Sequence, residues 1–170
     1  MSDIAIRPLT DDDAEPFKVL RLKAIQDAPT AIWPTHDEES GRTLEETRNR
    51  IRTTDHQIVF GAFAEAELIG IAGLRREALA QVAHKAVLWG VFVDPAHRRA
   101  GIAGRLLNAA IAHARAARVL QIHLCVNAEN PRAQALYRNA GFETFGIERR
   151  AMRVSNRFYD EEHMALRLDV

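Results

Sequence analysis

The sequence predicts a single α+β domain over residues 1–170, with about seven strands in a mixed, mostly antiparallel sheet. Its 170 residues, 47% hydrophobic and 27% charged, suit one globular core. The hydrophobic pattern gives the element order β-α-α-β-β-β-α-β-α-β-β, in which three of the six connections between successive strands contain no helix. One strand pair is instead joined through a long helix, and this connection favours a parallel pair within the sheet.

The first fifty residues are predicted to form a strand and two helices. Isoleucines alternate in residues 4–8, which is typical of a strand, and the helix that follows ends before Pro29. Residues 28–41 are expected to form an internal loop. A second helix is expected to start at Thr43 because Thr43 and Glu46 have the spacing of a capping box, in which each side chain accepts a hydrogen bond from the other residue's amide.

The middle of the chain is predicted to contain three strands, a long helix and a fourth strand. Residues 57–64 and 68–75 are β-rich and separated by a short turn, so they should pair as an antiparallel hairpin. The strand over residues 85–93 is ended by the Asp-Pro that follows it. Apolar residues over 103–114 recur with the period of a buried helical stripe. The run 120–126 follows this helix and should lie parallel to the strand over residues 85–93.

The last forty residues are predicted to form a helix and two long strand segments. Asn130 is placed to cap the helix, and Gly141 is placed to end it in the left-handed conformation. Residues 142–147 and 149–154 are expected to be strand. A two-residue turn then leads into a returning strand over residues 157–168.

Charge and composition restrict the classes of partner. Lys plus Arg equals Asp plus Glu at 23 each, so the net charge of zero offers no general attraction to nucleic acid or to an anionic membrane. The one cysteine, Cys125, lies in an apolar run, which predicts a core residue rather than a nucleophile. The histidines lack metal-binding spacing and the N-terminus lacks a secretion signal, so we expect no bound metal and a cytoplasmic protein.

The segment most informative about function is VFVDPAHRRAGIAGRLL, which runs from a strand through a glycine-containing loop into a helix. A helix N-terminus presents free backbone amides, so this arrangement predicts an anion site unless it is an ordinary turn with surface arginines. Gly101 and Gly104 permit close approach of a ligand to the backbone. The guanidinium groups of Arg98, Arg99 and Arg105 are suited to phosphate oxygens. The loop has neither GxGxxG nor Gly-Lys-Ser/Thr, which makes NAD and ATP poor candidates.

The pattern Arg98-x-x-Gly101-x-Ala103, after Val-Asp-Pro, resembles the acyl-coenzyme A loop of the GCN5-related N-acetyltransferase (GNAT) family. The later segment NAENPRAQALYRNAGF resembles that family's second cofactor segment, and DEEHMALRL resembles its closing strand. Two separate motifs in the expected secondary structure are far more specific than either motif alone. The resemblance implies a three-layer α/β/α domain with helices on both faces of the sheet, in which the parallel strand pair splays apart for acetyl-CoA.

The resemblance also implies roles for individual residues. The pantetheine arm of acetyl-CoA would lie between the splayed strands, bonded to backbone groups of Val91 and Val93. The backbone N–H near Phe92 would polarise the thioester oxygen, and Tyr137, otherwise a core aromatic, would protonate the departing thiolate. The implied cofactor-binding residues are Val91, Phe92, Val93, Arg98, Arg99, Ala100, Gly101, Ile102, Ala103, Gly104, Asn130 and Tyr137, and Asn130 can equally be a plain helix cap.

No general base can be assigned from the sequence. An amine must be neutral to attack a thioester, so a base is desirable. Many family members place a carboxylate on the strand before Val-Asp-Pro, but AVLWGVFV offers none. Glu38, Glu39, Glu77 and His84 are candidates, although each is more often a solvated surface residue.

These observations favour an acetyl-CoA-dependent N-acetyltransferase that transfers the acetyl group directly to a primary amine of a small molecule, peptide or protein. The alternative is a noncatalytic acyl-CoA-binding or regulatory module of the same fold, suggested by the missing strand carboxylate. The acceptor has no legible motif, and the residues proposed to contact it are Trp33, His36, Phe158 and Tyr159. The protein is expected to be a monomer or a homodimer.

Overall fold

The computed structural model describes residues 3–170, and its element order agrees with the prediction apart from one additional short helix. The strands are β1 (Ile4–Pro8), β2 (Gln57–Ala64), β3 (Glu67–Arg76), β4 (Lys85–Val93), β5 (Gln121–Asn127), β6 (Glu143–Val154) and β7 (Arg157–Arg167). The helices are α1 (Ala14–Asp27), α2 (His36–Ser40), α3 (Leu44–Ile51), α4 (Ile102–Ala116) and α5 (Pro131–Asn139), with 3-10 turns at Asp11–Asp13, Ala80–Val82 and Pro95–His97. Within the described residues, no helix is long and apolar enough to cross a membrane.

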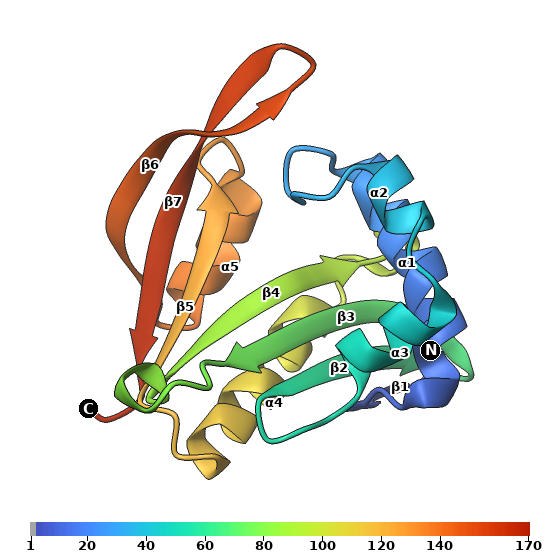
Figure 1. Cartoon of the computed structure of the whole chain (residues 1–170), viewed down its shortest axis with the longest axis horizontal. Coiled ribbons are helices and arrows are strands. Elements are labelled where there is room, and N and C mark those ends of the chain that lie inside the picture. Colours follow the sequence, from blue (N-terminus) through green and yellow to red (C-terminus); the bar gives the residue numbers. More distant parts are fainter. Residues whose placement is uncertain (1–2) are drawn as a thin grey trace.

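The strands form one sheet in the order β1-β2-β3-β4-β5-β7-β6 (Figure 1). Every neighbouring pair is antiparallel except β4 and β5. The exception follows from the connection, since α4 carries the chain back along the sheet between these two strands. The predicted mixed, mostly antiparallel sheet with one parallel pair is therefore confirmed.

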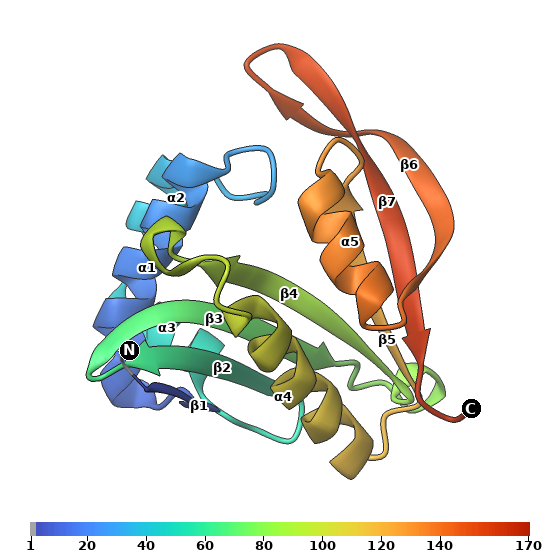
Figure 2. The same cartoon turned by 180° about the vertical axis from the view of Figure 1, so that it is seen from behind.

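Helices cover both faces of the sheet, as predicted. Phe17 and Leu20 of α1 are buried in a cluster on one face, to which α3 contributes Ile51. Leu106 and Leu107 of α4 are buried in a second cluster, which also takes in side chains of α5. Figure 2 shows α4 and α5 together on the face opposite α1 and α3. The apolar stripe read from the sequence of α4 is the surface that packs on the sheet.

The parallel pair is joined over only part of its length. Pairing between β4 and β5 begins at Lys85↔Gln121 and ends at Val87↔His123, so the second half of β4 has no strand beside it on this edge. A bulge follows at once. Two residues of β4, Gly90 and Val91, lie opposite one residue of β3, and Gly90 has φ +67°. The bulge turns the end of β4 away from β5 and opens the sheet between them (Figure 1).

One expectation about secondary structure needs correction. Residues 28–41 are not irregular throughout, because α2 begins within them. Its N-cap Thr35 accepts a hydrogen bond from the Glu38 amide while the Glu38 carboxylate accepts one from the Thr35 amide. The predicted strand segments 142–147 and 149–154, which occupy one position in the predicted element order, form the continuous strand β6, bent by irregular pairing with β7 near Gly146 and before Met152.

Candidate active site

A single long cleft of about 1280 Å³ runs past the open end of β4. Its walls come from α1 and the loop after it, from β4 and the loop leading into α4, and from β5 and α5. All of the predicted cofactor-binding residues line it except Ala100, which lies exposed in the loop. Segments far apart in the sequence thus meet around one space, which the open sheet creates.

The loop before α4 has the geometry of an anion site. Gly101 is the N-cap of α4 with φ +72°, a left-handed conformation that favours glycine. A Cβ at Gly101 or at Gly104 would meet no atom within 4 Å, so open space lies beside the backbone. The first amides of a helix have no intrahelical partner, and here they face this space together with the positive end of the helix dipole.

The arginines of this loop divide into two groups. Arg98 donates to the Asp27 carboxylate at 2.6 Å and to the carbonyl oxygen of Val93 at 3.1 Å, and Arg105 donates to the carbonyl of Ile4. Their guanidinium groups therefore hold the loop to the end of β4 and to β1 rather than standing free for phosphate. Arg99 is exposed and forms no ion pair within residues 3–170, so its side chain is the one available to an anion.

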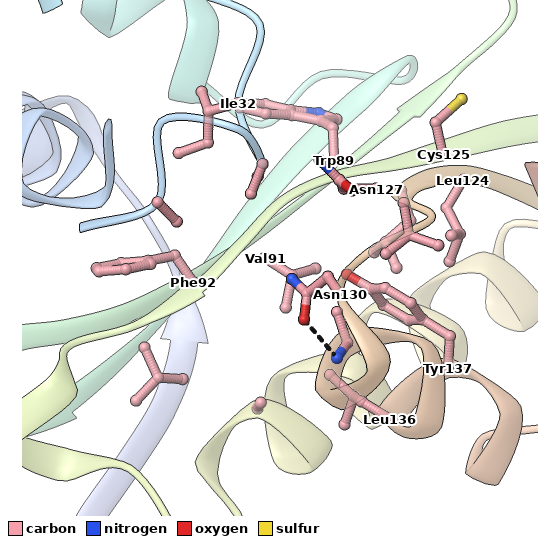
Figure 3. Close-up of a pocket in the computed structure, with 18 of the residues that line it drawn as sticks. Ile32, Trp89, Val91, Phe92, Leu124, Cys125, Asn127, Asn130, Leu136 and Tyr137 are labelled. Atoms are coloured by element: carbon pink, nitrogen blue, oxygen red, sulfur yellow. Dashed lines mark hydrogen bonds between the residues drawn. The ribbon is translucent and has the colours of Figure 1, made fainter. Parts of the chain in front are cut away.

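Tyr137 and Asn130 lie on α5 at the other side of the gap. Figure 3 shows the Tyr137 hydroxyl directed toward the part of the cleft where Val91 and Asn130 lie. Burial raises the pKa of Tyr137 to about 12, so the phenol is protonated at neutral pH. The Asn130 side chain accepts a hydrogen bond from the Ala133 amide at 3.1 Å and caps α5 (Figure 3).

Comparison with known proteins identifies the family. The sequence profile of the acetyltransferase (GNAT) family matches residues 22–142. The chain belongs to the GNAT family. It is also 36% identical over 107 residues to the N-alpha-acetyltransferase RimI of Mycobacterium tuberculosis, and the match covers 63% of this chain and 65% of RimI. The match thus spans slightly less than two thirds of the length of this relative.

Solved structures agree on the fold. A GNAT acetyltransferase from Streptococcus pneumoniae superimposes with a TM-score of 0.88 at 23% identity, over 98% of this chain and 100% of the other. An acetyltransferase from Salmonella typhimurium, solved with its cofactor acetyl-CoA, gives a TM-score of 0.85 at 20% identity, over 99% of this chain and 96% of the other. The three-layer fold with a split parallel pair is therefore the GNAT fold.

The sequence candidates for a base are not gathered at the GNAT cleft. Glu77 and His84 flank the paired end of β4 and do not line it. Glu38 lines the cleft, but its carboxylate accepts the Thr35 amide at 2.7 Å. Glu39, expected to be solvated, is 2% exposed and accepts hydrogen bonds from Arg50 at 3.0 and 3.3 Å. The expectation for Glu39 is wrong because Arg21, Arg42 and Arg50 surround its carboxylate.

A carboxylate that sequence reasoning missed does line the cleft. Glu161 of β7 is 4% exposed, and its Oε1 accepts a hydrogen bond from Trp33 Nε1 at 2.7 Å. Its Oε2 is buried and has no partner within residues 3–170. The sequence contained one indication of this residue, namely two consecutive acidic residues inside a predicted strand. Consecutive side chains of a strand point to opposite faces of the sheet, so the two carboxylates must lie on different faces. The other acid, Glu162, is bound by Arg138 and Gln134.

Cys125 also differs from its prediction. It is exposed and lines the cleft, because only its neighbours in β5 point into the core. Burial and the nearby carboxylates of Glu161 and Glu148 raise the pKa of its thiol to about 11, which disfavours the nucleophilic thiolate. Its Sγ lies 3.3 Å from Nδ1 of His163. Ligand atoms of Cys125, Glu161 and His163 lie within 4.8 Å of one another, a set that could hold a metal ion.

Of the residues proposed to contact the acceptor, Trp33 lines the cleft. Its indole crosses from the loop after α1 to Glu161 on β7, so it joins the two walls. His36, Phe158 and Tyr159 do not line the cleft. They lie on α2 and at the start of β7, close in sequence to cleft residues but directed elsewhere.

Proposed function

We propose that this GNAT enzyme, a single domain over residues 1–170, transfers an acetyl group directly from acetyl-CoA to a primary amine. The observation that carries the proposal is the split between β4 and β5, which joins an anion loop at one end to Tyr137 and a buried carboxylate at the other. An elongated ligand with a phosphate part and an uncharged arm suits this arrangement. The acceptor is a small molecule, or an N-terminal amine of the kind that the name of the RimI relative describes.

The backbone supplies the contacts proposed for acetyl-CoA. Phosphate groups would meet the amides that follow Gly101 and the free guanidinium of Arg99. The arm would lie along β4, where Val91 and Val93 offer backbone groups on an edge with no neighbouring strand. Because Arg98 holds the Val93 carbonyl, the amide of Val93 and the groups of Val91 are those left for the ligand. A backbone N–H of this open edge next to Phe92 would donate to the thioester oxygen as negative charge develops there. The Phe92 amide itself faces β3, because Phe92 pairs with Ile71 and the Asp94 amide donates to Ile69 in the same register.

Tyr137 is proposed to supply the proton for the leaving group. As the amine nitrogen bonds to the carbonyl carbon and the carbon–sulfur bond breaks, the sulfur takes a proton from the Tyr137 hydroxyl, which later regains one from solvent. A phenol of pKa about 12 is a weak acid for a thiolate in water. The apolar surroundings that raise the pKa of Tyr137 would raise that of a buried thiolate as well, so the two groups stay matched.

Glu161 is proposed to bind the acceptor amine and to accept its proton. One carboxylate oxygen is fixed by Trp33, and the other is buried at the cleft without a partner among residues 3–170. A buried carboxylate with an unpaired oxygen suits an ammonium ion, and a neutral amine forms when the proton passes to that oxygen. The noncatalytic alternative was suggested by the absence of a carboxylate on β4, and Glu161 removes that reason.

Thermal denaturation and product analysis test the proposal together. Acetyl-CoA at a hundredfold excess over its Kd should stabilise the protein by about 2.7 kcal/mol, and NAD should not. Mass spectrometry should then detect an N-acetylated product from a panel of primary amines. An unchanged melting temperature with saturating acetyl-CoA would refute the cofactor assignment. Stabilisation without acetylation of any amine in the panel would favour the noncatalytic module.

A further inference from the structure

The GNAT cleft carries an unusual concentration of positive charge on its α1 side. Four of its lining residues are arginines that converge from α1, from the loop before α3, from α3 and from β3. They are Arg21, Arg42, Arg50 and Arg75. This group lies on the α1 face of the sheet, whereas the anion loop belongs to α4 on the opposite face (Figures 1 and 2). The arginine group is therefore separate from the proposed phosphate site.

The carboxylates near this group do not balance it. Glu39 is bonded by Arg50, and Nε of Arg42 lies 3.5 Å from it. Nε of Arg21 is 4.0 Å from the same carboxylate, beyond hydrogen-bond distance. Among the other acidic residues that line the cleft, Glu38 caps α2, Asp27 holds Arg98 and Glu161 accepts from Trp33. One buried carboxylate thus faces several guanidinium groups.

Arg21 is the residue of this group with the most unmade hydrogen bonds. It is 4% exposed, and both Nε and Nη1 are buried without a hydrogen-bond partner within residues 3–170. Burial first, and then the charge of Arg50, lower its pKa to about 10, so it is still protonated at neutral pH. A buried cation with unmade hydrogen bonds destabilises the folded protein. Such a cost is typical of a binding site whose ligand supplies the missing acceptors.

The position of Arg21 points to the reacting centre. A Cβ placed on Gly90 would lie 3.3 Å from Nη1 of Arg21, so the guanidinium reaches the bulge of β4. Gly90 directly precedes Val91 and Phe92, beside which the arm and the thioester of acetyl-CoA are proposed to lie. A side chain at Gly90 would be strained by its φ of +67° and would also crowd Arg21. The glycine therefore leaves room for this guanidinium next to the open edge of β4.

The indole of Trp89 fixes the two guanidinium groups nearest to this point. The guanidinium carbon of Arg50 lies 4.7 Å from the centre of the Trp89 ring, and that of Arg21 lies 5.8 Å away. Trp89 is itself held over Gly73, where a Cβ would lie only 2.2 Å from the ring. Because the arginines are already ordered by stacking, an anion would meet them with little further loss of side-chain entropy.

We propose that the acceptor is a small molecule whose amine is accompanied by a carboxylate, and that Arg21 and Arg50 bind this carboxylate. The inference rests on the proposed acetyl transfer and specifies its substrate class. A carboxylate at the end of a small molecule can reach a guanidinium group as deeply buried as that of Arg21. A peptide N-terminus has no carboxylate beside its amine, and a basic peptide would be repelled by the uncompensated arginines.

Matched acceptors test the proposal. Each L-amino acid in a panel is assayed beside its own carboxamide, so that the amine and side chain stay the same and only the negative charge is lost. We expect kcat/KM to be roughly 10²-fold higher for the preferred acid than for its carboxamide. In the presence of CoA, the same acid should raise the melting temperature more than its carboxamide does. Short peptides with a free N-terminus form the third arm of the panel.

Variants connect the preference to the arginines. Arg21→Gln is expected to abolish the preference for the acid while the stabilisation by acetyl-CoA persists. If Arg21→Gln does not fold, Arg50→Gln, in which a half-buried partner of Glu39 is replaced, serves the same purpose. The control is Arg48→Gln on the exposed side of α3, which should leave the preference intact.

The outcomes separate this inference from the proposed function. Acetylation of uncharged amines or peptides at kcat/KM equal to or above that of the acids would overturn the inference and leave acetyl transfer standing. An acid preference that survives both Arg21→Gln and Arg50→Gln would also overturn it. Failure of acetyl-CoA to stabilise the protein would refute the proposed function itself, and the inference with it.

Discussion

Alanine substitutions at two glycines, Gly101 and Gly104, test the proposed phosphate site. Both should weaken CoA binding, but they should change protein stability in opposite directions. Gly104→Ala places a methyl group in the first turn of α4, where a Cβ meets nothing within 4 Å and φ is not left-handed. Alanine is the better helix former by about 0.5–1 kcal/mol, and the first turn should yield the lower part of that range. At about 2–4 °C per kcal/mol for a chain of this size, the melting temperature should rise by about 1–2 °C.

Gly101→Ala should lower stability instead. Its φ of +72° costs a residue with a side chain about 1–2 kcal/mol, which corresponds to a melting temperature lower by about 2–8 °C. Both methyl groups occupy the open space beside the loop, so both variants should bind CoA at least about tenfold more weakly, a loss of roughly 1.4 kcal/mol. Gly104→Ala is thus expected to be the more stable protein and the weaker binder.

Calorimetric titration with CoA and thermal denaturation of the same samples measure both effects. The matched control is Gly146→Ala on β6, where a Cβ also meets nothing within 4 Å but the residue does not line the cleft. This control should bind CoA with wild-type affinity. Wild-type affinity in Gly104→Ala would show that the open space beside the loop does not receive the phosphates, and the reasoning would fail.

Three further predictions concern single side chains. Tyr137→Phe should keep acetyl-CoA affinity but lower the single-turnover rate roughly 10²-fold. In the wild type, ionisation of Tyr137 should not lower the rate below about pH 11. Equal rates for the two proteins would return Tyr137 to a core role. Alkylation of Cys125 by iodoacetamide should quicken about tenfold per pH unit from pH 7 to 10, and a plateau near pH 8 would contradict its raised pKa. Burial would raise the pKa of Asp94, but hydrogen bonds from Lys23 and the Ala96 amide outweigh it and lower the pKa. Wild-type stability should therefore fall as pH drops below about 4, and Asp94→Asn should show a shallower fall in acid urea titrations.

The sequence was sufficient for those parts of the fold that depend on local pattern. The stripe in α4 and the crossover after Val93 imply the parallel pair without reference to distant residues. The short helix α2 was missed although Thr35 and Glu38 have capping-box spacing, because its five residues closely follow Pro29 and Pro34 and have no apolar stripe. The bulge at Gly90 was missed as well, since an isolated glycine in a strand does not reveal how its partner strand is registered.

The candidate site was predictable only where its residues are neighbours in the chain. The loop from Arg98 to Gly104 could be read as one segment. Glu161, in contrast, reaches the cleft because β7 pairs with β5, a strand distant from it in the sequence. Cys125 was misjudged for a related reason. Strands of a parallel pair are usually covered on both faces, but the opening between β4 and β5 leaves this side of β5 uncovered.

The unpaired edge of β4 also affects how substitutions act on the enzyme. The groups that it is proposed to offer to acetyl-CoA are peptide N–H and C=O groups, which every residue other than proline carries in the same form. A change of side chain along this edge therefore leaves those donors and acceptors in place, whereas the proposed roles of Arg21 and Glu161 depend on atoms that a single substitution deletes. Acceptor preference can consequently be altered by mutation while the affinity for the acyl donor is retained, so a search for new acceptors should begin on the α1 side of the cleft.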